Sequence, residues 1–207
     1  VRERWHNDWP RKSRMPEPLI IVFLKAPRHG AVKTRLAKSI GPEAACQAYM
    51  EMSQSVLETL RGFNRVQLRF TPDNAKSEIQ SLLQPDWSSA PQGSGDLGER
   101  MKRAFQETAG PAILIGTDCP TIEPTDLDEA RSALEIHPVV IGPARDGGYW
   151  LIGMCECYPD LFTGIHWSTD RVFSETMNRA KQAGLPVQTL RTLADIDTKA
   201  DWEKWSG

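Results

Sequence analysis

Residues 19–36 read LIIVFLKAPRHGAVKTRL, and this stretch decides the fold class. Its first six residues are apolar without interruption, which is typical of a strand buried on both faces. A loop follows that contains Pro27, Gly30, Lys33 and Arg35. Glycine allows backbone shapes that other residues resist, and the cations could converge on an anion. Because α/β proteins hold phosphate this way at the carboxyl edge of a sheet, the stretch predicts a protein that handles nucleotides or phosphates.

Composition narrows the class of protein. The chain has 207 residues, 40% of them hydrophobic and 25% charged, which suits a soluble globular domain. Its formal net charge of −2 provides no basic field for nucleic acid. No apolar run approaches the roughly 20 residues that span a bilayer, and the first 18 residues lack a signal-peptide core, so we expect a cytoplasmic protein. Four cysteines are too few for a disulfide scaffold and predict reduced thiols. The oligomeric state is not predicted.

Domain organisation follows from the change of pattern near Pro18. Residues 1–17 are rich in Trp, Arg and Pro without a clean period, and we expect an N-terminal extension that stays flexible or packs on the domain or on a partner. Residues 18–207 are expected to form a single domain.

Strands and helices are expected to alternate along that domain. Apolar runs and alternation predict strands over 19–24, 65–71, 112–116, 139–142, 149–154 and 186–190. Helical periodicity predicts helices over 43–61, 74–83, 96–108, 125–136, 168–183 and 199–205. Asp96, Thr125 and Ser168 are the expected caps of three of these helices. This order predicts an α/β fold with a mostly parallel sheet covered by helices on both faces, and the closely spaced late strands predict a mixed sheet.

The first candidate site is the cationic loop, with Lys25, Gly30, Lys33 and Arg35. Phosphoryl and nucleotidyl transfer build negative charge around phosphorus, and fixed cations lower that barrier. The spacing is not that of a Walker A loop. An ordinary solvated basic loop is the alternative, and the buried strand before it favours a site.

Carboxylates provide the second candidate site. Asp118 follows a buried strand, so it is expected at the carboxyl edge of the sheet, level with the cationic loop. One or two carboxylates together with substrate phosphates are the usual ligands of magnesium, and Asp197 could be the second. Asp118 could instead bond nearby amides in a turn, and either Asp197 or Thr198 could simply cap the last helix.

Three further segments could receive a substrate, and each has an ordinary structural alternative. Paired glycines allow a ligand to approach the backbone closely, but Asp-Gly is also common in hairpin turns. A glycine-dense loop before a helix could hold a base or phosphate, or be a flexible surface loop. Trp167 could stack on a substrate, although packing is the more ordinary role. The residues concerned are Asp146, Gly147, Gly148 and Tyr149, then Gln92, Gly93 and Gly95, and Trp167.

Taken together, these motifs resemble those of a family of small bacterial proteins with a glycosyltransferase-A-like fold, in the nucleotide-diphospho-sugar transferase superfamily. The matching residues are Phe23, Lys25, Pro27, Gly30, Lys33, Thr34, Arg35 and Leu36, then Gly116, Asp118 and Pro120, then Asp146, Gly147, Gly148 and Tyr149, and finally Asp195, Asp197 and Thr198. The chain is also similar to nucleotidyltransferases of the phospholactate guanylyltransferase type. The resemblance implies a Rossmann-like α/β/α sandwich that binds a nucleoside triphosphate or a nucleotide sugar with a divalent cation, Mg²⁺ or Mn²⁺.

Two reactions fit this resemblance. In nucleotidyl transfer to a small phosphorylated or hydroxyl acceptor, Lys33 and Arg35 would hold the triphosphate, and Asp118 with Asp197 would hold the metal. In glycosyl transfer, a nucleotide sugar would lose its nucleoside diphosphate. We favour the first, because two cations early in the loop suit a triphosphate and residues 116–118 lack an Asp-x-Asp. A non-catalytic nucleotide-binding protein is the third hypothesis.

Overall fold

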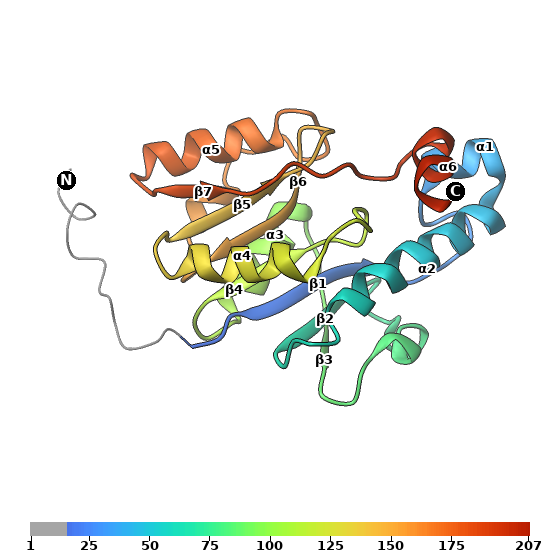
Figure 1. Cartoon of the computed structure of the whole chain (residues 1–207), viewed down its shortest axis with the longest axis horizontal. Helices are drawn as coiled ribbons and strands as arrows, with labels where there is room; N and C mark the ends of the chain where they lie inside the picture. The colour runs from blue at the N-terminus through green and yellow to red at the C-terminus, as the bar shows by residue number, and fades with distance from the viewer. Residues whose placement is uncertain (1–15) are drawn as a thin grey trace.

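The computed structural model describes residues 16–207, and the expected N-terminal extension lies outside them except for its last two residues. The elements follow in the order β1 (Leu19–Lys25), α1 (Thr34–Ile40), α2 (Pro42–Thr59), β2 (Val66–Thr71), η1 (Lys76–Glu78), η2 (Gln80–Leu82), β3 (Ser88–Pro91), α3 (Leu97–Gln106), β4 (Ala112–Ile115), α4 (Pro124–Leu134), β5 (Val139–Pro143), β6 (Tyr149–Met154), η3 (Pro159–Phe162), α5 (Val172–Gln182), β7 (Val187–Thr189) and α6 (Lys199–Ser206) (Figure 1).

One seven-stranded sheet runs through the molecule in the order β3-β2-β1-β4-β6-β5-β7. Strand β6 is antiparallel to its neighbours β4 and β5, and the other pairs are parallel. The carboxyl ends of β1, β4 and β5 therefore share an edge with the first residue of β6. The expected mostly parallel, partly mixed sheet is confirmed.

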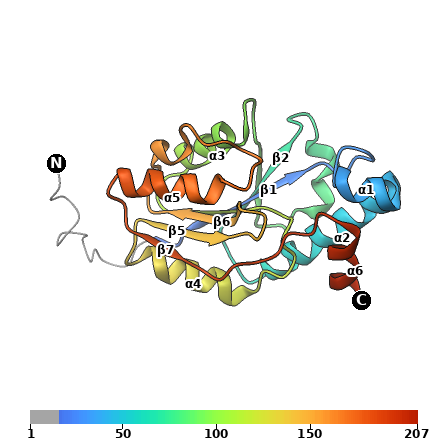
Figure 2. The same ribbon diagram turned by 90° about the horizontal axis from the view of Figure 1, so that it is seen from above.

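The core has two layers, one on each face of the sheet. Alternate residues of β1 belong to different clusters: Ile20, Val22 and Leu24 pack with α2 and α4, whereas Ile21 and Phe23 pack with α3 and α5. A period of two with both faces covered explains why this strand is apolar throughout. Viewed from above, α2 and α4 lie on one side of the sheet and α3 and α5 on the other (Figure 2). The result is the expected three-layer α/β/α sandwich.

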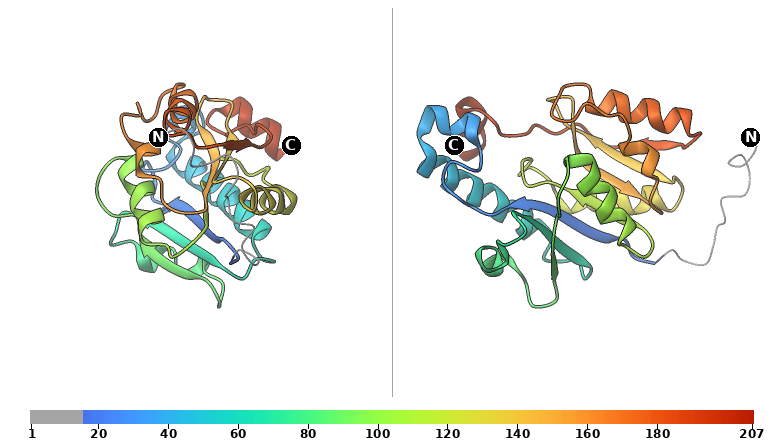
Figure 3. Two further views of the ribbon diagram at one scale, coloured as in Figure 1. Left: turned by 90° about the vertical axis from the view of Figure 1, so that its left-hand side faces the viewer. Right: turned by 180° about the vertical axis from the view of Figure 1, so that it is seen from behind.

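The last segment of the chain returns to the first loop. After β7 it runs along the carboxyl edge of the sheet, and α6 then lies against α1, as the view from behind also shows (Figure 3). Ile196 is buried in a cluster with Val32 and Tyr49, and Trp202 and Trp205 pack on that cluster. Residues 190–198, which we call the strap, thereby join the last helix to the edge where β1 and β4 end.

One expected helix differs from the structure, and two further elements were not expected. Residues 74–83 form the short 3₁₀ turns η1 and η2. Only Ala75 and Ile79 are fully buried there, whereas Leu82 and Leu83 are partly buried, and a short helix is marginal without extensive packing. Residues 34–40 form a helix and residues 88–91 a strand, and neither was expected. Among the helices of residues 16–207, none is long and apolar enough to cross a bilayer.

Helix starts were predicted with mixed success. Asp96 caps α3 and Thr198 caps α6, each accepting an N–H from three residues on. Thr125 is not a cap: α4 starts after Glu123 because Pro124, which lacks an N–H, occupies its first position. Ser168 is not a cap either. Its φ of 62° is incompatible with a helix, and α5 begins four residues later.

Candidate active site

A cleft of about 930 Å³ opens at the edge where β1 and β4 end and β6 begins. One part is charged, with Lys25, Lys33, Arg35, Asp118, Asp146, Asp195 and Asp197, and another is largely apolar, with Phe23, Leu97, Met101, Leu114, Tyr149 and Trp167. Segments from both ends of the chain thus meet around a single cavity large enough for a small-molecule ligand.

The first loop reaches the cleft through its cations and not through its Pro and Gly. Pro27 and Gly30 do not line the cleft; Gly30 adopts a φ of 75° within the turn. Lys33 precedes α1 with φ 45° and ψ 48°, a left-handed conformation that a lysine adopts at a cost. Arg35 belongs to the first turn of α1 and not to a loop, and its side chain is 73% exposed.

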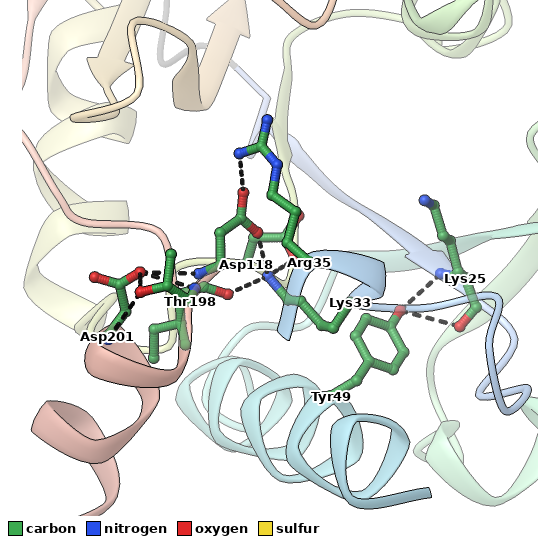
Figure 4. Close-up of polar contacts among 9 residues, drawn as sticks. Lys25, Lys33, Arg35, Tyr49, Asp118, Thr198 and Asp201 are labelled. Atoms are coloured by element: carbon green, nitrogen blue, oxygen red, sulfur yellow. Dashed lines mark hydrogen bonds and ion pairs between the residues drawn. The ribbon is translucent and has the colours of Figure 1, made fainter. Parts of the chain in front are cut away.

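Lys33 lies at the centre of the charged part of the cleft. Its Nζ is 2.6 Å from Asp118 Oδ1 and 3.2 Å from Asp197 Oδ1. It also donates a hydrogen bond of 2.6 Å to the carbonyl of Ile196. Burial alone would lower the pKa of this ammonium, but Asp118 and Asp197 outweigh it, so the pKa of Lys33 is raised and the side chain is a cation. Figure 4 shows Lys33 pointing to Asp118 beside Arg35.

The two carboxylates remain accessible while they share this cation. The Asp118 side chain is 60% exposed, and Asp197 also contacts Arg35 Nη1 through its second oxygen at 3.2 Å. Thr198 is the N-cap of α6, so Asp197 does not cap that helix. The strap is aligned with β4 by a backbone hydrogen bond of 3.0 Å from Ile196 N–H to the carbonyl of Asp118.

Two further carboxylates, of Asp195 and Asp146, line the same cleft. Burial and then the nearby charge of Asp146 raise the pKa of Asp195 above its ordinary value. The neighbouring thiol of Cys119 is buried, and burial raises its pKa strongly, so it is a neutral thiol and no ready nucleophile.

The carboxylates of the cleft fit a divalent cation that binds together with a phosphate ligand. Within residues 16–207, no three His, Cys, Asp or Glu side chains converge as a metal-binding group. The cleft offers two carboxylates, Asp118 and Asp197, that converge on a single positive charge. Magnesium is held by one or two carboxylates together with waters and substrate phosphates, so this pair fits an ion that binds with a phosphate ligand.

The glycine-rich loop before α3 is held firmly. Gln92 is buried, and its side-chain nitrogen donates to the carbonyls of Leu24 and Arg69, at 3.0 Å each. Arg100 donates to the carbonyl of Gly95 at 2.9 Å and lines the cleft with it. Gly93 does not line the cleft; its N–H is bonded to Asp73. The loop thus provides a shaped wall and not a flexible surface.

The β5–β6 hairpin contributes Asp146, Gly148 and Tyr149 to the cleft, but not Gly147. The carboxylate of Asp146 accepts the N–H of Gly148 at 2.8 Å, so one oxygen is used in the turn. Gly147 has a φ of 89°, and a Cβ there would lie 2.1 Å from the carbonyl oxygen of Asp170. Its observed role is to let the loop before α5 approach the hairpin.

Trp167 both packs and lines the cleft. Its ring lies so close to Gly98 that a Cβ on that residue would be 2.4 Å away. It also stacks on Phe162, with ring centroids 6.4 Å apart. A ligand in the apolar part of the cleft could therefore contact a fixed aromatic ring.

Sequence reasoning missed two residues at the cleft. Tyr49 counted as one member of an apolar helical stripe, and periodicity cannot show that its hydroxyl reaches the end of β1. Arg100 lies one helical turn after the cap Asp96, and a cation on the helix that follows a glycine-dense loop is the signal that could have identified it.

Comparisons with known proteins agree with this fold. A family described as "Uncharacterized protein conserved in bacteria (DUF2064)" matches residues 57–169. A "putative nucleotide-diphospho-sugar transferase" from Desulfovibrio desulfuricans G20 is 33% identical, with a TM-score of 0.82 over 89% of this chain and 84% of that chain. No curated protein matches the sequence.

More distant solved structures share the fold alone. The inositol-1-phosphate CTP transferase of T. maritima is 13% identical, with a TM-score of 0.59 over 93% of this chain and 97% of that chain. Rv0371c of Mycobacterium tuberculosis H37Rv, in complex with manganese, is 15% identical, with a TM-score of 0.53 over 91% and 97%. The resemblance to nucleotide-diphospho-sugar transferases, inferred from motifs, is confirmed.

Proposed function

The chain belongs to the bacterial family DUF2064, and we propose that it is a metal-dependent nucleotidyltransferase acting on a nucleoside triphosphate. The observation that carries this proposal is the contact of Lys33 with both Asp118 and Asp197 in the cleft. It brings a cation from the loop after β1 together with two carboxylates at the carboxyl edge of the sheet.

The proposed reaction joins an acceptor oxygen to the α-phosphorus. The bond from that phosphorus to the bridging oxygen breaks, pyrophosphate leaves, and a hydroxyl acceptor releases its proton to solvent. Lys33 and Arg35 would bind the triphosphate, and Lys25 and Arg100 add positive charge to the same cleft. Cations fixed around phosphorus stabilise the charge that develops in the transition state.

Asp118 and Asp197 would hold the divalent cation. When bound, that ion neutralises phosphate charge and orients the leaving group. The Mn²⁺ complex of Rv0371c, which shares the fold, supports a divalent cation here without identifying it. Asp146, Gly148, Tyr149 and Trp167 would contact the acceptor, since they form the cleft wall from the β5–β6 hairpin to the loop before α5.

Glycosyl transfer from a nucleotide sugar is the second candidate function. The name printed for the Desulfovibrio protein, 33% identical to this chain, favours it. The name of the more distant inositol-1-phosphate CTP transferase favours nucleotidyl transfer. A single aspartate after β4, in place of an Asp-x-Asp, leads us to prefer nucleotidyl transfer.

The experiment has two steps. First, the melting temperature is measured with each NTP and with nucleotide sugars, in the presence of Mg²⁺ or Mn²⁺, because a ligand of the folded state raises it. The nucleotide that stabilises the protein is then incubated with small phosphorylated and hydroxyl acceptors while pyrophosphate and nucleoside diphosphate are assayed. Release of pyrophosphate would support nucleotidyl transfer. Nucleoside diphosphate released from a nucleotide sugar would replace it with the second function.

A pair of variants ties the activity to the cleft. Asp118→Asn should lower turnover about 100-fold or more, the effect expected when a group that stabilises transition-state charge is lost. Asp86→Asn makes the same change at an exposed position outside the cleft and should leave turnover unchanged. Equal activity of both variants would remove Asp118 from the reaction.

A further inference from the structure

The ammonium of Lys33 has a complete set of hydrogen-bond partners. An ammonium has three donors, and here the three acceptors are Asp118 Oδ1, Asp197 Oδ1 and the carbonyl of Ile196, at 2.6, 3.2 and 2.6 Å. The side chain is only 4% exposed. The two carboxylates that suit a divalent cation therefore already share a cation of the protein itself.

The positive φ of Lys33 is a second sign that this residue has a functional role. Within residues 16–207, Lys33 and Ser168 are the non-glycine residues with positive φ, and both line the cleft. Strained conformations persist where surrounding contacts hold them, and they gather at functional sites. The Lys33 ammonium contacts Asp118, in the turn after β4, and the strap.

The contact is nevertheless open to a ligand from one side. Asp118 is mostly exposed although it pairs with a buried ammonium, and Arg35, which contacts the outer oxygen of Asp197, is exposed as well. A phosphate group could thus approach Arg35 and the exposed side of Asp118, next to the buried ammonium of Lys33.

We propose that Lys33 is a placeholder cation: in the nucleotide-free protein it occupies the space between Asp118 and Asp197 and excludes a divalent cation. Phosphate groups of the nucleotide provide new partners for the ammonium, which leaves the carboxylates free. The divalent cation then binds with the nucleotide and not before it. This inference rests on the proposed function and adds an order of binding to it.

The test measures Mn²⁺ affinity without nucleotide, by electron paramagnetic resonance of free Mn²⁺. Lys33→Met should bind Mn²⁺ about tenfold or more tightly than the unmodified protein, because the competing charge is gone. Lys38→Met removes an exposed lysine from α1, the helix that follows Lys33, and should change nothing. The gain should disappear in Lys33→Met combined with Asp118→Asn. A gain that persists in that double variant, or no gain at all, overturns the inference.

A second variant guards against misfolding. Lys33→Gly also removes the ammonium, and glycine adopts positive φ without strain, so the backbone conformation is retained. It should show the same gain in Mn²⁺ affinity. If neither folded variant binds Mn²⁺ more tightly than the unmodified protein, Lys33 is not a placeholder.

A third measurement separates this inference from the proposed function. Inorganic tripolyphosphate presents the phosphate groups without a base, and proton relaxation enhancement distinguishes protein-bound Mn²⁺ from the free chelate. Tripolyphosphate should raise the affinity of the unmodified protein for Mn²⁺. This rise in affinity should be smaller in Lys33→Met. Strong binding of Mn²⁺ alone to the unmodified protein would reject the role of Lys33 as a placeholder cation. It would not contradict the proposed nucleotidyl transfer. Failure of the NTP assay would instead reject the function.

Discussion

The hydroxyl of Tyr49 binds the main chain of Lys25 in both directions. It accepts the N–H of Lys25 at 2.7 Å and donates to its carbonyl at 3.0 Å (Figure 4). Tyr49 belongs to α2 and is buried, whereas Lys25 is the last residue of β1, where the first loop begins. One side chain thus fixes the point at which the central strand becomes the cleft.

Tyr49→Phe keeps the ring and removes both hydrogen bonds. Because the polar groups of Lys25 would lose their partner, we expect the free energy of unfolding to fall by about 1–3 kcal/mol. Nucleotide affinity should also fall, since the loop that carries Lys33 begins at this residue. Urea unfolding and nucleotide titration measure the two effects. Tyr158→Phe is the matched control, because that buried hydroxyl has no partner among the described residues; equal losses in both variants would contradict a specific role for Tyr49.

The sheet could be predicted because each central strand carries its own signal. β1 and β4 are buried on both faces and read as apolar runs, and the β5–β6 pair flanks an Asp-Gly turn. Strand β3 was missed, since Ser88–Pro91 lies at the edge of the sheet and buries little apolar surface. Local sequence shows what a strand buries, not which neighbour it pairs with.

The candidate site was predictable only as a set of residues. The carboxyl edge of the sheet correctly indicated that Lys33 and Asp118 would meet. Nothing in the sequence shows that Lys33 bonds the strap at Ile196, because that contact joins residues far apart in the chain. The left-handed conformation of Lys33 was equally hidden, since positive φ is uncommon outside glycine and lysine gives no signal for it.

Arg35→Ala tests whether the first turn of α1 binds phosphate. The side chain is exposed and contacts only Asp197 among the described residues, so the free energy of unfolding should change by less than about 0.5 kcal/mol. Loss of a charge-assisted hydrogen bond should weaken triphosphate binding about tenfold. Calorimetry with the NTP and with the corresponding monophosphate should show a smaller loss for the monophosphate. Arg61→Ala, at an exposed arginine outside the cleft, is the control; if Arg35→Ala binds like it, Arg35 does not contact phosphate.

Gly147→Ala tests the packing of the hairpin against the loop before α5. The added Cβ would meet the carbonyl oxygen of Asp170 at 2.1 Å on a residue with φ 89°. We expect the free energy of unfolding to fall by about 3 kcal/mol or more, from strain and steric overlap together. Gly62→Ala is the matched control, since its Cβ would meet no atom within 4 Å. Chemical denaturation of both variants gives the answer, and similar stabilities would refute the close approach.

Glu175→Gln tests a carboxylate that holds the segment carrying Trp167 through hydrogen bonds. The carboxylate of Glu175, on α5, accepts the backbone N–H of His166 at 2.8 Å and contacts its ring nitrogen at 2.9 Å. The backbone N–H of His166, and then its ring, lower the pKa of Glu175 below its ordinary value of 4.5. Because the folded protein favours the charged form, this contribution to stability is present above pH 4.5 and is lost as the pH falls through the lowered pKa.

At neutral pH the melting temperature of Glu175→Gln should therefore lie below that of the unmodified protein, by about 4 °C at most. The difference should shrink as the solution is acidified below pH 4.5, because protonation then removes the charge from the unmodified protein as well. Glu129→Gln, at an exposed position on α4, should show no such convergence. A difference that stays constant down to the acid end would mean that the amide disturbs packing and that the charge of Glu175 does not stabilise the loop.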